Sequence, residues 1–488
     1  MAAVEEKSGR YSLSEVREFG RVKKGYTQFI NGDLIFAKIT PCMENGKIAV
    51  VDNLENGIGF GSTEFHVSRL TKLTNRKYLF YYLIQETFSR NARQHLTGSA
   101  GQLRLPKSYF AEVLIPLAPL DEQQRIVEKL EELFSDLGKG IENLKTAQKQ
   151  LKVYRQAVLK WALEGKLTEK WRSQVKQEQS AIKTGDELLA QITTEREKLY
   201  QQQFAEWEEA VKKWEANGKP GNKPSKPQKP KRLSSLTEAE ITELPKLPDG
   251  WCWANLGHLK QFSLYGPRFS SQDYVDDGIL VLRTSDISEL GKVDFKKAPK
   301  LPLTKEEYEK YKLVKGDLLI TRTGSIGTIS VFNDTVRAIP GAFLIHYRLL
   351  APINVWFIFY FLKSFKAQQH FKDKSAGVGR PNLNVPNIEE LKISIPSFEE
   401  QEEIVQEIES RLSICDQLET TIIENLQKAE ALQQSILKQA FEGKLVPQDP
   451  NDDPAEKLLE GIRAERQAKA IAKDKSQSIY HQLTIQEI

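Results

Sequence analysis

Cysteines are few in this sequence, and long apolar runs are absent. The three cysteines, Cys42, Cys252 and Cys415, stand far apart. This spacing argues against a disulfide framework and a zinc site, because both need clustered ligands. Isolated cysteines are typical of a reducing compartment. No N-terminal signal pattern is present, and no apolar stretch reaches the roughly 18 residues needed to span a bilayer. The sequence therefore predicts a cytoplasmic protein with no membrane partner and no bound metal.

Signatures of catalysis are also missing. There is no Gly-x4-Gly-Lys-Ser/Thr phosphate loop and no Asp/Asn-Pro-Pro-aromatic tetrapeptide, which argues against a nucleotide triphosphatase and an amino-methyltransferase. A nuclease-like Glu-x-Lys pattern occurs at Glu164/Lys166 and again at Glu442/Lys444. Each copy surrounds a glycine at the end of a predicted helix, so a repeated helix stop explains the pattern better than a catalytic site.

What the sequence does contain is an internal repeat. Residues 123–127 return as 401–405, and residues 164–167 return as 442–445, both at an offset of 278. The part upstream of the helices is related by an offset of 284. A duplicated globular unit builds a pseudo-twofold object, which suits two half-sites on one DNA duplex.

Each copy begins with an α/β pattern. Short apolar runs bounded by turn residues predict strands, and they follow the same order in both copies: residues 33–39, 47–51 and 113–115, then 317–321, 328–332 and 391–395. Helical periodicity starts near residue 78 in the first copy and near residue 356 in the second.

Each copy ends in a predicted helix of about 45 residues, which would be roughly 65 Å long. Apolar residues recur every seven positions and predict a coiled-coil seam: Leu130, Leu137, Leu144, Leu151 and Val158 in the first helix, and Ile408, Cys415, Ile422, Ala429 and Ile436 in the second. Two heptad helices of equal length in one chain favour pairing with each other, and the long connection between them allows an antiparallel arrangement. The alternative is that each helix packs on its own domain.

Charge is distributed unevenly. Residues 10–116 and 251–397 each have a net charge of +6, whereas residues 398–446 have a net charge of −7. Basic globular units favour a polyanionic ligand, although an excess of this size is also within ordinary scatter.

Loops after the predicted strands carry side chains suited to phosphates and base edges. The candidates are Lys38, Thr40, Asn45, Lys47 and Arg104 in the first copy, and Arg283, Thr284, Ser285, Arg322, Thr323, Arg380, Asn382 and Asn384 in the second. Any single one of them can equally be a solvated loop side chain. The set is more persuasive because both copies place it after corresponding strands.

Between the copies, residues 186–214 predict a helix, and residues 217–232 contain four prolines and six basic residues without an acid. This composition predicts an extended linker. It would be solvated or would touch DNA phosphate.

These motifs resemble the DNA-specificity subunit of type I restriction-modification enzymes. The resemblance rests on doubled patterns that cover nearly the whole chain: Gly-Asp-Leu-Ile at 32–35 and Gly-Asp-Leu-Leu at 316–319, Leu-Asp-Glu-Gln at 120–123 and Phe-Glu-Glu-Gln at 398–401, Glu-Gly-Lys-Leu at 164–167 and 442–445, and Leu-Pro-Asp-Gly-Trp at 247–251.

The resemblance implies a fold of two repeated α/β target recognition domains separated by a long antiparallel two-helix coiled coil. Each domain would read one half of a split DNA target, and the chain itself would be non-catalytic and bind no cofactor. Its partners would be double-stranded DNA, two modification subunits that use S-adenosylmethionine, and restriction subunits that use ATP and magnesium.

The corresponding domain boundaries divide the chain into six parts. We expect a first recognition domain at 1–117, a first conserved helix at 118–170, a helical segment and Pro/Lys-rich linker at 171–245, a second recognition domain at 246–397, a second conserved helix at 398–446, and a helical tail at 447–488. The first domain lacks a counterpart of about 34 residues that should include an opening strand. We therefore expect weak reading of the first half-site.

Two alternatives stay open at this point. A nuclease would need a carboxylate cluster that the sequence does not reveal, and purified chain with magnesium would cut DNA. A coiled-coil scaffold would bind only proteins, and it would lack the salt-dependent duplex binding expected of a DNA-binding subunit.

Overall fold

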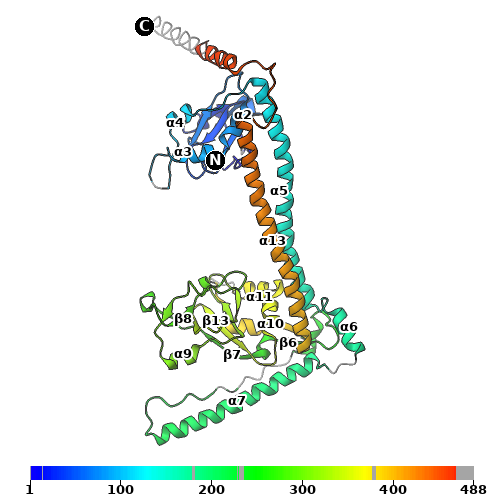
Figure 1. Cartoon of the computed structure of the whole chain (residues 1–488). Helices are drawn as coiled ribbons and strands as arrows, with labels where there is room; N and C mark the ends of the chain where they lie inside the picture. The colour runs from blue at the N-terminus through cyan, green and yellow to red at the C-terminus, as the bar shows by residue number, and fades with distance from the viewer. Residues whose placement is uncertain are drawn as a thin grey trace. The chain divides into compact units, whose positions relative to one another are not determined.

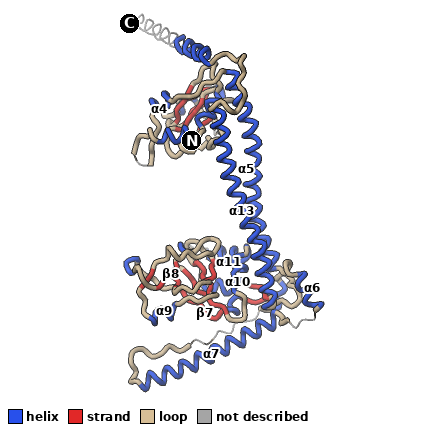
Figure 2. Tube along the Cα trace, in the orientation of Figure 1, coloured by secondary structure: helices blue, strands red, loops and turns tan. Residues whose placement is uncertain are grey.

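The computed structural model describes residues 2–13, 15–99, 101–178, 182–227, 229, 236–375 and 381–468. The chain forms two compact units. The first, here unit 1, contains residues 1–147 and 421–488, and the second, unit 2, contains residues 148–420. Strands and helices are mixed in both units (Figure 2).

In unit 1 the central strand β2 pairs antiparallel with β3 and β5, and β1 pairs antiparallel with β4. The strands are β1 (Thr27–Ile30), β2 (Leu34–Ala37), β3 (Ile48–Val50), β4 (Ile58–Gly61) and β5 (Phe65–Ser68). The short helices are α1 (Phe19–Val22), α2 (Arg76–Leu83), α3 (Glu86–Arg93) and α4 (Lys107–Glu112). All four residues of β2 are buried, as expected of a central strand with both faces covered.

Unit 2 repeats this plan and extends it. Its strands are β6 (Cys252–Asn255), β7 (Lys260–Tyr265), β8 (Ile279–Leu282), β9 (Lys300–Leu301), β10 (Asp317–Thr321), β11 (Ile329–Phe332), β12 (Ala338–Pro340), β13 (Leu344–Leu349) and β14 (Lys392–Ile395). The sheet orders are β11-β10-β13-β7, β12-β8-β9 and β14-β6. Strand β10 lies between β11 and β13 as β2 lies between β3 and β5, so the duplicated sequence has a duplicated topology.

Unit 2 contains a long helical segment that precedes its first strand. The helices of the unit are α6 (Glu169–Gln177), α7 (Gly185–Ala216), α8 (Glu238–Thr242), α9 (Lys305–Tyr311), α10 (Val355–Lys363), α11 (Phe365–Ser375) and α12 (Val385–Glu389). Helix α7 starts at a capping box in which Thr184 and Glu187 bond each other's backbone N–H groups.

The two long helices are α5 (Leu120–Leu163) and α13 (Phe398–Phe441), coloured cyan and orange in Figure 1. In unit 1 the start of α5 packs on the end of α13: Ile126 and Leu130 share a core with Ile436 and Ala440. In unit 2 the end of α5 packs on the start of α13: Val158 and Ala162 share a core with Ile404 and Ile408. The helices are therefore paired and antiparallel.

Each long helix ends at a glycine in the left-handed region. Gly165 has φ of 72° and Gly443 has φ of 71°. The backbone N–H of Lys166 donates to the carbonyl oxygen of Trp161, and that of Lys444 donates to Gln439, both at 2.9 Å. This is the 6→1 bond of a glycine-terminated helix. Glu164 pairs with Lys166, and Glu442 pairs with Lys444, each at 2.7 Å, so both Glu-x-Lys patterns belong to helix ends.

A buried glutamine fastens each long helix to its globular unit. Gln123 accepts from the backbone N–H of Asn75 at 3.1 Å, and Gln401 accepts from that of Asn354 at 3.0 Å. Asn75 and Asn354 are the N-caps of α2 and α10. The Glu-Gln motif at the start of α5 and α13 thus has a packing role in both repeats.

One expected strand is wrong. Residues 113–115 form no strand, although their counterpart β14 is a strand. The difference lies in the partner, because β14 pairs with β6, and the described residues of unit 1 contain no counterpart of β6. Leu114 is left 89% exposed.

The described part of the linker is largely solvent-exposed, as expected, but it is attached to α7. Trp207 Nε1 donates to the carbonyl of Pro224 at 2.9 Å, and Trp214 Nε1 donates to that of Pro220 at 3.0 Å. Lys226 Nζ lies over the rings of Phe204 and Trp207. The proline-rich segment therefore folds back onto the aromatic stripe of α7 up to residue 227, and residues 228 and 230–232 lie outside the described residues. In the C-terminal tail, residues 447–454 form loops and turns, residues 455–468 are helical, and residues 469–488 lie outside the described residues.

Candidate nucleic-acid interface

The Gly-Asp-Leu motif fixes the start of the central strand in each unit. Asp33 accepts hydrogen bonds from the backbone N–H of Ile30 at 2.9 Å and from the guanidinium of Arg69 at 2.8 and 2.9 Å. Asp317 accepts from Val314 N–H at 2.7 Å and from Arg348 at 2.5 and 2.7 Å. This repeated ion pair between a buried aspartate and an arginine orients the strand whose far end carries the candidate interface.

At the far end of β2, two loops meet. The backbone N–H of Leu105 donates to the carbonyl oxygen of Lys38 at 2.8 Å, and that of Thr40 donates to Leu103 at 2.9 Å. The Thr40 hydroxyl accepts from Leu103 N–H at 3.1 Å. Thr40 therefore closes the junction, and Lys38 and Arg104 lie side by side on it.

Arg104 is held by an acid that sequence reasoning missed. Its Nε and NH2 groups donate to the two oxygens of Glu64, each at 2.9 Å. The hydrogen bonds from Arg104 lower the pKa of Glu64, and the charge of Lys38 adds to this effect. Glu64 precedes β5 directly, and nothing in its sequence context distinguishes it from a solvated acid.

Below this junction lies His66, which was also missed. Its Nε2 is 2.8 Å from the carbonyl oxygen of Leu105, and its ring stacks on Phe110. Burial lowers the pKa of His66, and the positive charges of Lys38 and Lys107 lower it further. The imidazole is therefore neutral at pH 7 and acts as a support for the Leu105 loop.

The other two candidates of unit 1 lie at the opposite end of the loop after β2. Asn45 donates through Nδ2 to Glu6 at 2.7 Å. Lys47 forms a β-bridge with Glu6, and its carbonyl accepts from Ala37 N–H at 3.0 Å. The structure therefore places Lys38, Thr40 and Arg104 at the junction with residues 103–105, and it places Asn45 and Lys47 beside Glu6, with Lys47 bonded to the end of β2.

At the end of β10, the same junction recurs with other side chains. The backbone N–H of Leu383 donates to the carbonyl oxygen of Arg322 at 2.9 Å. Arg322 Nε donates to Asn382 Oδ1 at 2.9 Å, and its guanidinium lies 4.2 Å from the ring centroid of Tyr265. Asn382 in turn approaches Asn384 at 3.5 Å. Tyr265, which ends β7, was missed in the sequence because only the fold brings it to this loop.

The two junctions are equivalent. Lys38 corresponds to Arg322 at the offset of 284, and Arg104 corresponds to Asn382 at the offset of 278. Leu105, which follows Arg104, and Leu383, which follows Asn382, are both buried. Each unit thus presents two adjacent long polar side chains on a rigid loop pair, with one buried leucine below.

The remaining candidates of unit 2 are placed differently. Arg283 donates to Asp286 at 2.8 and 3.0 Å and to the carbonyl of Lys297 at 2.8 Å, and Ser285 donates to Asp286 at 3.3 Å. Thr284 begins the short 3-10 turn in this loop. Thr323 follows Arg322 in the loop after β10, and Arg380 lies outside the described residues. Arg283 and Ser285 thus close a turn around the buried Asp286, and the Arg283 side chain is as exposed as that of Arg104, each at 40%.

The predicted seam of the long helices lies between α5 and α13. Six of its positions are buried: Leu130, Val158, Ile408, Cys415, Ile422 and Ile436. Four are half-buried: Leu137, Leu144, Leu151 and Ala429. Leu130 and Ile436 belong to the core of unit 1, and Val158 and Ile408 belong to the core of unit 2.

Among the described residues, no group of three or more His, Cys, Asp or Glu side chains is placed to hold a metal ion. None of the described helices is long and apolar enough to cross a membrane.

Comparisons with known proteins agree with this architecture. The sequence model of the type I restriction modification DNA specificity domain matches residues 6–146 and again residues 277–428, which together make up more than half of the chain. The two matches fall on the two repeats, one in each half of the sequence.

Individual relatives are more distant. The type I restriction enzyme EcoAI specificity subunit of Escherichia coli is 26% identical over 476 residues, with 84% of this chain and 72% of the relative covered. The EcoEI specificity subunit of the same species is 26% identical over 462 residues, with the same coverage.

The fold has a solved counterpart. A chain from a study of complex assembly and conformational transition in the type I R-M system superposes with a TM-score of 0.64 at 18% identity, covering 91% of this chain and 90% of that one. The duplicated family match, the antiparallel helix pair and this superposition agree with one another. The chain belongs to the family of type I restriction modification DNA specificity domains.

Proposed function

We propose that this chain is the non-catalytic DNA sequence-recognition subunit of a type I restriction-modification complex. In this proposal each globular unit reads one half of a bipartite duplex target. The observation that carries the proposal is the repeated junction at which Lys38 and Arg104 in unit 1, and Arg322 and Asn382 in unit 2, stand on equivalent loops.

The side chains at these junctions match the chemistry of DNA. An arginine donates two hydrogen bonds to guanine O6 and N7, an asparagine pairs with adenine N6 and N7, and a lysine contacts phosphate as a point charge. Arg322 is stacked on Tyr265 and bonded to Asn382, so its guanidinium is already oriented before DNA binds. Such preorganisation reduces the entropy lost on binding.

Unit 1 presents a different set of side chains to DNA. Arg104 is bound to Glu64, so its base-reading geometry would depend on that acid. A carboxylate can itself accept a hydrogen bond from cytosine N4. The two units therefore differ in the chemistry they present, which is expected if they read two different half-sites.

The helix pair supports a second part of the proposal, the docking of partner subunits. Apolar side chains stay exposed on α5 and α13 after the helices have paired: Val153, Ile414 and Leu418 in unit 2, and Ile423 and Leu432 in unit 1. Exposed apolar residues on an otherwise acidic helix are typical of a protein interface. Two such regions, one in each unit, fit two modification subunits.

In this arrangement the chemistry on DNA belongs to the partners. Methyl transfer from S-adenosylmethionine to adenine would take place on the modification subunits, and ATP- and magnesium-dependent cleavage on the restriction subunits. The role of this chain's own residues is to bind the duplex and to position it.

The test is a methylation map of the assembled system. The full chain is expressed with its modification and restriction subunits, and methylated adenines are located by long-read sequencing of the host DNA. We expect one split motif with two specific halves and a fixed gap. Asn382→Ala should relax one half only, and Arg104→Ala should relax the other half only.

Two results would overturn the proposal: a contiguous motif, or two variants that relax the same half. The alternative function, a scaffold that binds proteins without reading DNA, predicts no change in motif for either variant. It also predicts no linear fall of log affinity with log salt for a duplex carrying the motif.

A further inference from the structure

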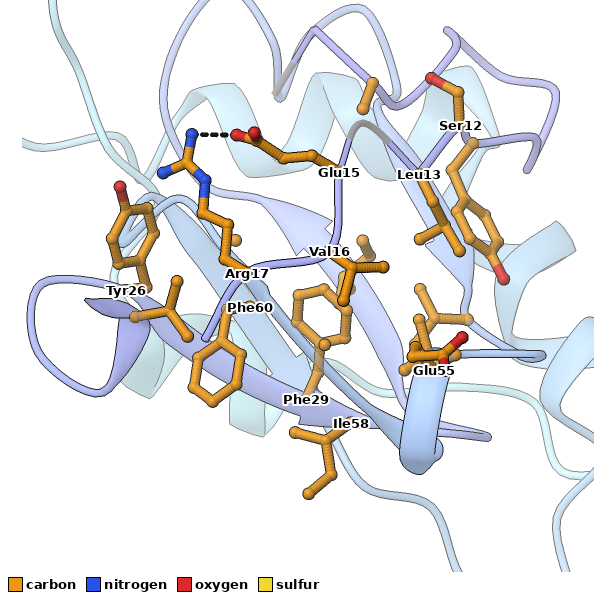
Figure 3. A pocket seen from close by; sticks show the side chains of 18 of the residues that line it. Ser12, Leu13, Glu15, Val16, Arg17, Tyr26, Phe29, Glu55, Ile58 and Phe60 are labelled. Carbon is orange, nitrogen blue, oxygen red and sulfur yellow. Dashed lines mark ion pairs between the residues drawn. The ribbon is translucent and has the colours of Figure 1, made fainter. Parts of the chain in front are cut away.

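Unit 1 contains an apolar cavity of about 600 Å³ beside strand β4 (Figure 3). Phe29, Ile58 and Phe60 project into it, and the segment that carries Leu13 and Val16 crosses it. Leu13 is 62% exposed and Val16 is 77% exposed. This segment therefore covers the cavity without filling it.

The internal repeat identifies what fills the same place in unit 2. Four buried residues that line the cavity have counterparts in one core cluster of unit 2, at offsets between 279 and 284: Phe29, Ile35, Val51 and Phe65 correspond to Leu313, Leu319, Phe332 and Leu344. In unit 2 these residues pack around Leu282, with Leu280 against the same cluster. Both of these leucines belong to β8.

The backbone beside the cavity has a free edge as well. In unit 2, β8 runs parallel to β12: Leu280 N–H donates to the carbonyl of Arg337 at 3.1 Å, and Gly341 N–H donates to that of Leu282 at 2.8 Å. The offset of 279 places the equivalent carbonyl at Ile58 and the equivalent N–H at Ser62. Within the described part of unit 1, β4 pairs only with β1, so no strand pairs with its other edge.

We propose that this cavity and the free edge of β4 form an acceptor site for an extended apolar segment that adds a parallel strand to unit 1. The occupant has the chemistry of β8: consecutive branched apolar residues, of which alternate ones enter the cavity. Strand addition of this kind takes affinity from backbone hydrogen bonds and specificity from side-chain pockets.

Charge at the rim favours a basic residue next to the apolar run. Glu15 and Glu55 both border the cavity, whereas Arg17 is the only basic residue among its lining side chains and is paired with Glu15. β8 itself is followed by Arg283. The acceptor site therefore suits a segment that combines branched apolar residues with a positive charge.

The probe is a fluorescent peptide with the sequence of residues 278–284, which contains the apolar run and Arg283 without the neighbouring aspartates, added to the full chain. We expect saturable binding with a dissociation constant on the order of 10 μM, measured by anisotropy. The matched control peptide carries L280D and L282D, which put charges into the cavity, and it should bind at least tenfold more weakly. Hydrogen exchange should show new protection at residues 58–62, and none at 338–341, where β8 is already in place.

Protein variants locate the site. Val16→Asp and Ile58→Asp place charges at the cavity and should weaken binding about tenfold or more. Leu114→Asp, which changes a more exposed apolar residue outside the cavity, should leave binding unchanged. Val16 has a largely exposed side chain, so that variant should fold even where Ile58→Asp does not.

Three outcomes of the peptide experiment would overturn the proposal, and self-association of the full chain would be a fourth. The first three are no binding of the probe peptide, equal binding of both peptides, and protection outside residues 58–62. Self-association of the full chain with protection of residues 58–62 in the absence of peptide would identify a second copy as the occupant, contrary to the proposal. None of these measurements uses DNA, so they are independent of the proposed recognition function.

Discussion

The indole Nε1 of Trp251 donates to a carboxylate oxygen of Glu400 at 2.8 Å, across 149 residues of sequence. The other oxygen of Glu400 accepts from Thr168 at 2.7 Å and from Arg172 at 2.5 Å. One buried carboxylate at the start of α13 thus joins the segment after α5 to the strand region at β6. This explains why the Leu-Pro-Asp-Gly-Trp motif ends in tryptophan.

Trp251→Phe should destabilise unit 2 by about 2 kcal/mol or more, because it removes one hydrogen bond to a buried charged group and replaces the indole with a smaller aromatic ring. The control is Trp253→Phe, whose indole donates to the carbonyl of Pro245 at 3.3 Å near the surface, with a loss of about 0.5 kcal/mol or less expected. Hydrogen exchange of β6 and β14 would measure both. Equal effects of the two variants would contradict the role assigned to Glu400.

The ion pair at Asp317 should make unit 2 sensitive to acid. Burial alone would raise the pKa of Asp317, but the hydrogen bonds from Arg348 and His346 outweigh burial and lower it below the ordinary 3.8. Because the folded pKa is the lower one, the ionised carboxylate stabilises the fold above pH 3.8, and this contribution is lost as the pH falls further. Urea unfolding followed between pH 3 and 6 would detect the loss.

The Asp317→Asn variant separates this effect from general acid unfolding. It should lose about 3 kcal/mol at neutral pH, because Arg348 is left without its partner, and its stability should fall less steeply below pH 3.8. Asp277→Asn changes an exposed acid of the same unit and is the control. An unchanged acid dependence in the Asp317 variant would contradict this assignment.

Helix α5 contains two glycines that its packing does not require. Added Cβ atoms at Gly138 and Gly140 would meet nothing within 4 Å, so Gly138→Ala and Gly140→Ala should each stabilise the helix by about 0.5–1 kcal/mol. Gly165→Ala should instead destabilise, because Gly165 has φ of 72° and its Cβ would lie 2.7 Å from Pro248. Thermal unfolding by circular dichroism would compare the three, and a gain from Gly165→Ala would contradict the role of that glycine as a helix stop.

Alanine substitutions at the junctions should affect DNA binding differently from an alanine substitution of Arg283. Arg322→Ala should weaken binding of the duplex target about 10- to 100-fold and relax one base position, whereas Lys38→Ala should lower the salt slope by about one. Arg283→Ala should affect thermal stability more than affinity, because its guanidinium is bound within the turn at Asp286. Fluorescence titrations at several salt concentrations would distinguish the three, and a larger loss of affinity for Arg283→Ala would reverse this ranking.

Local patterns in the sequence were sufficient for much of the fold. Apolar runs beside Gly32 and Gly316 predicted β2 and β10, and heptads ending at Gly165 and Gly443 predicted the two long helices. The fold class is confirmed by the family match to both repeats. These features depend on periodicity and backbone conformation, which a short stretch of sequence carries.

Features that depend on distant partners were not predictable. Residues 113–115 have the composition of a strand but no strand to pair with, and Pro220–Lys226 has the composition of a free linker but packs on nearby indoles. At the junctions, Glu64 and Tyr265 come from strands remote in sequence. Candidate DNA contacts such as Arg283 and Arg104 look alike as sequence, and only the fold shows that each is bonded to an acid, Asp286 and Glu64 respectively.

The stop at Gly165 has a consequence for the stretch that follows it. Gly165 lies against Pro248, and the backbone N–H of Gly185 donates to the carbonyl of Gly250 at 2.7 Å. The chain thus leaves the globular part of unit 2 and returns to it at the same place. The second half of α7 and the proline-rich segment that packs on it contact mainly each other. A fluorescent protein or affinity tag grafted at residues 217–221 should therefore be carried without disturbing either recognition unit.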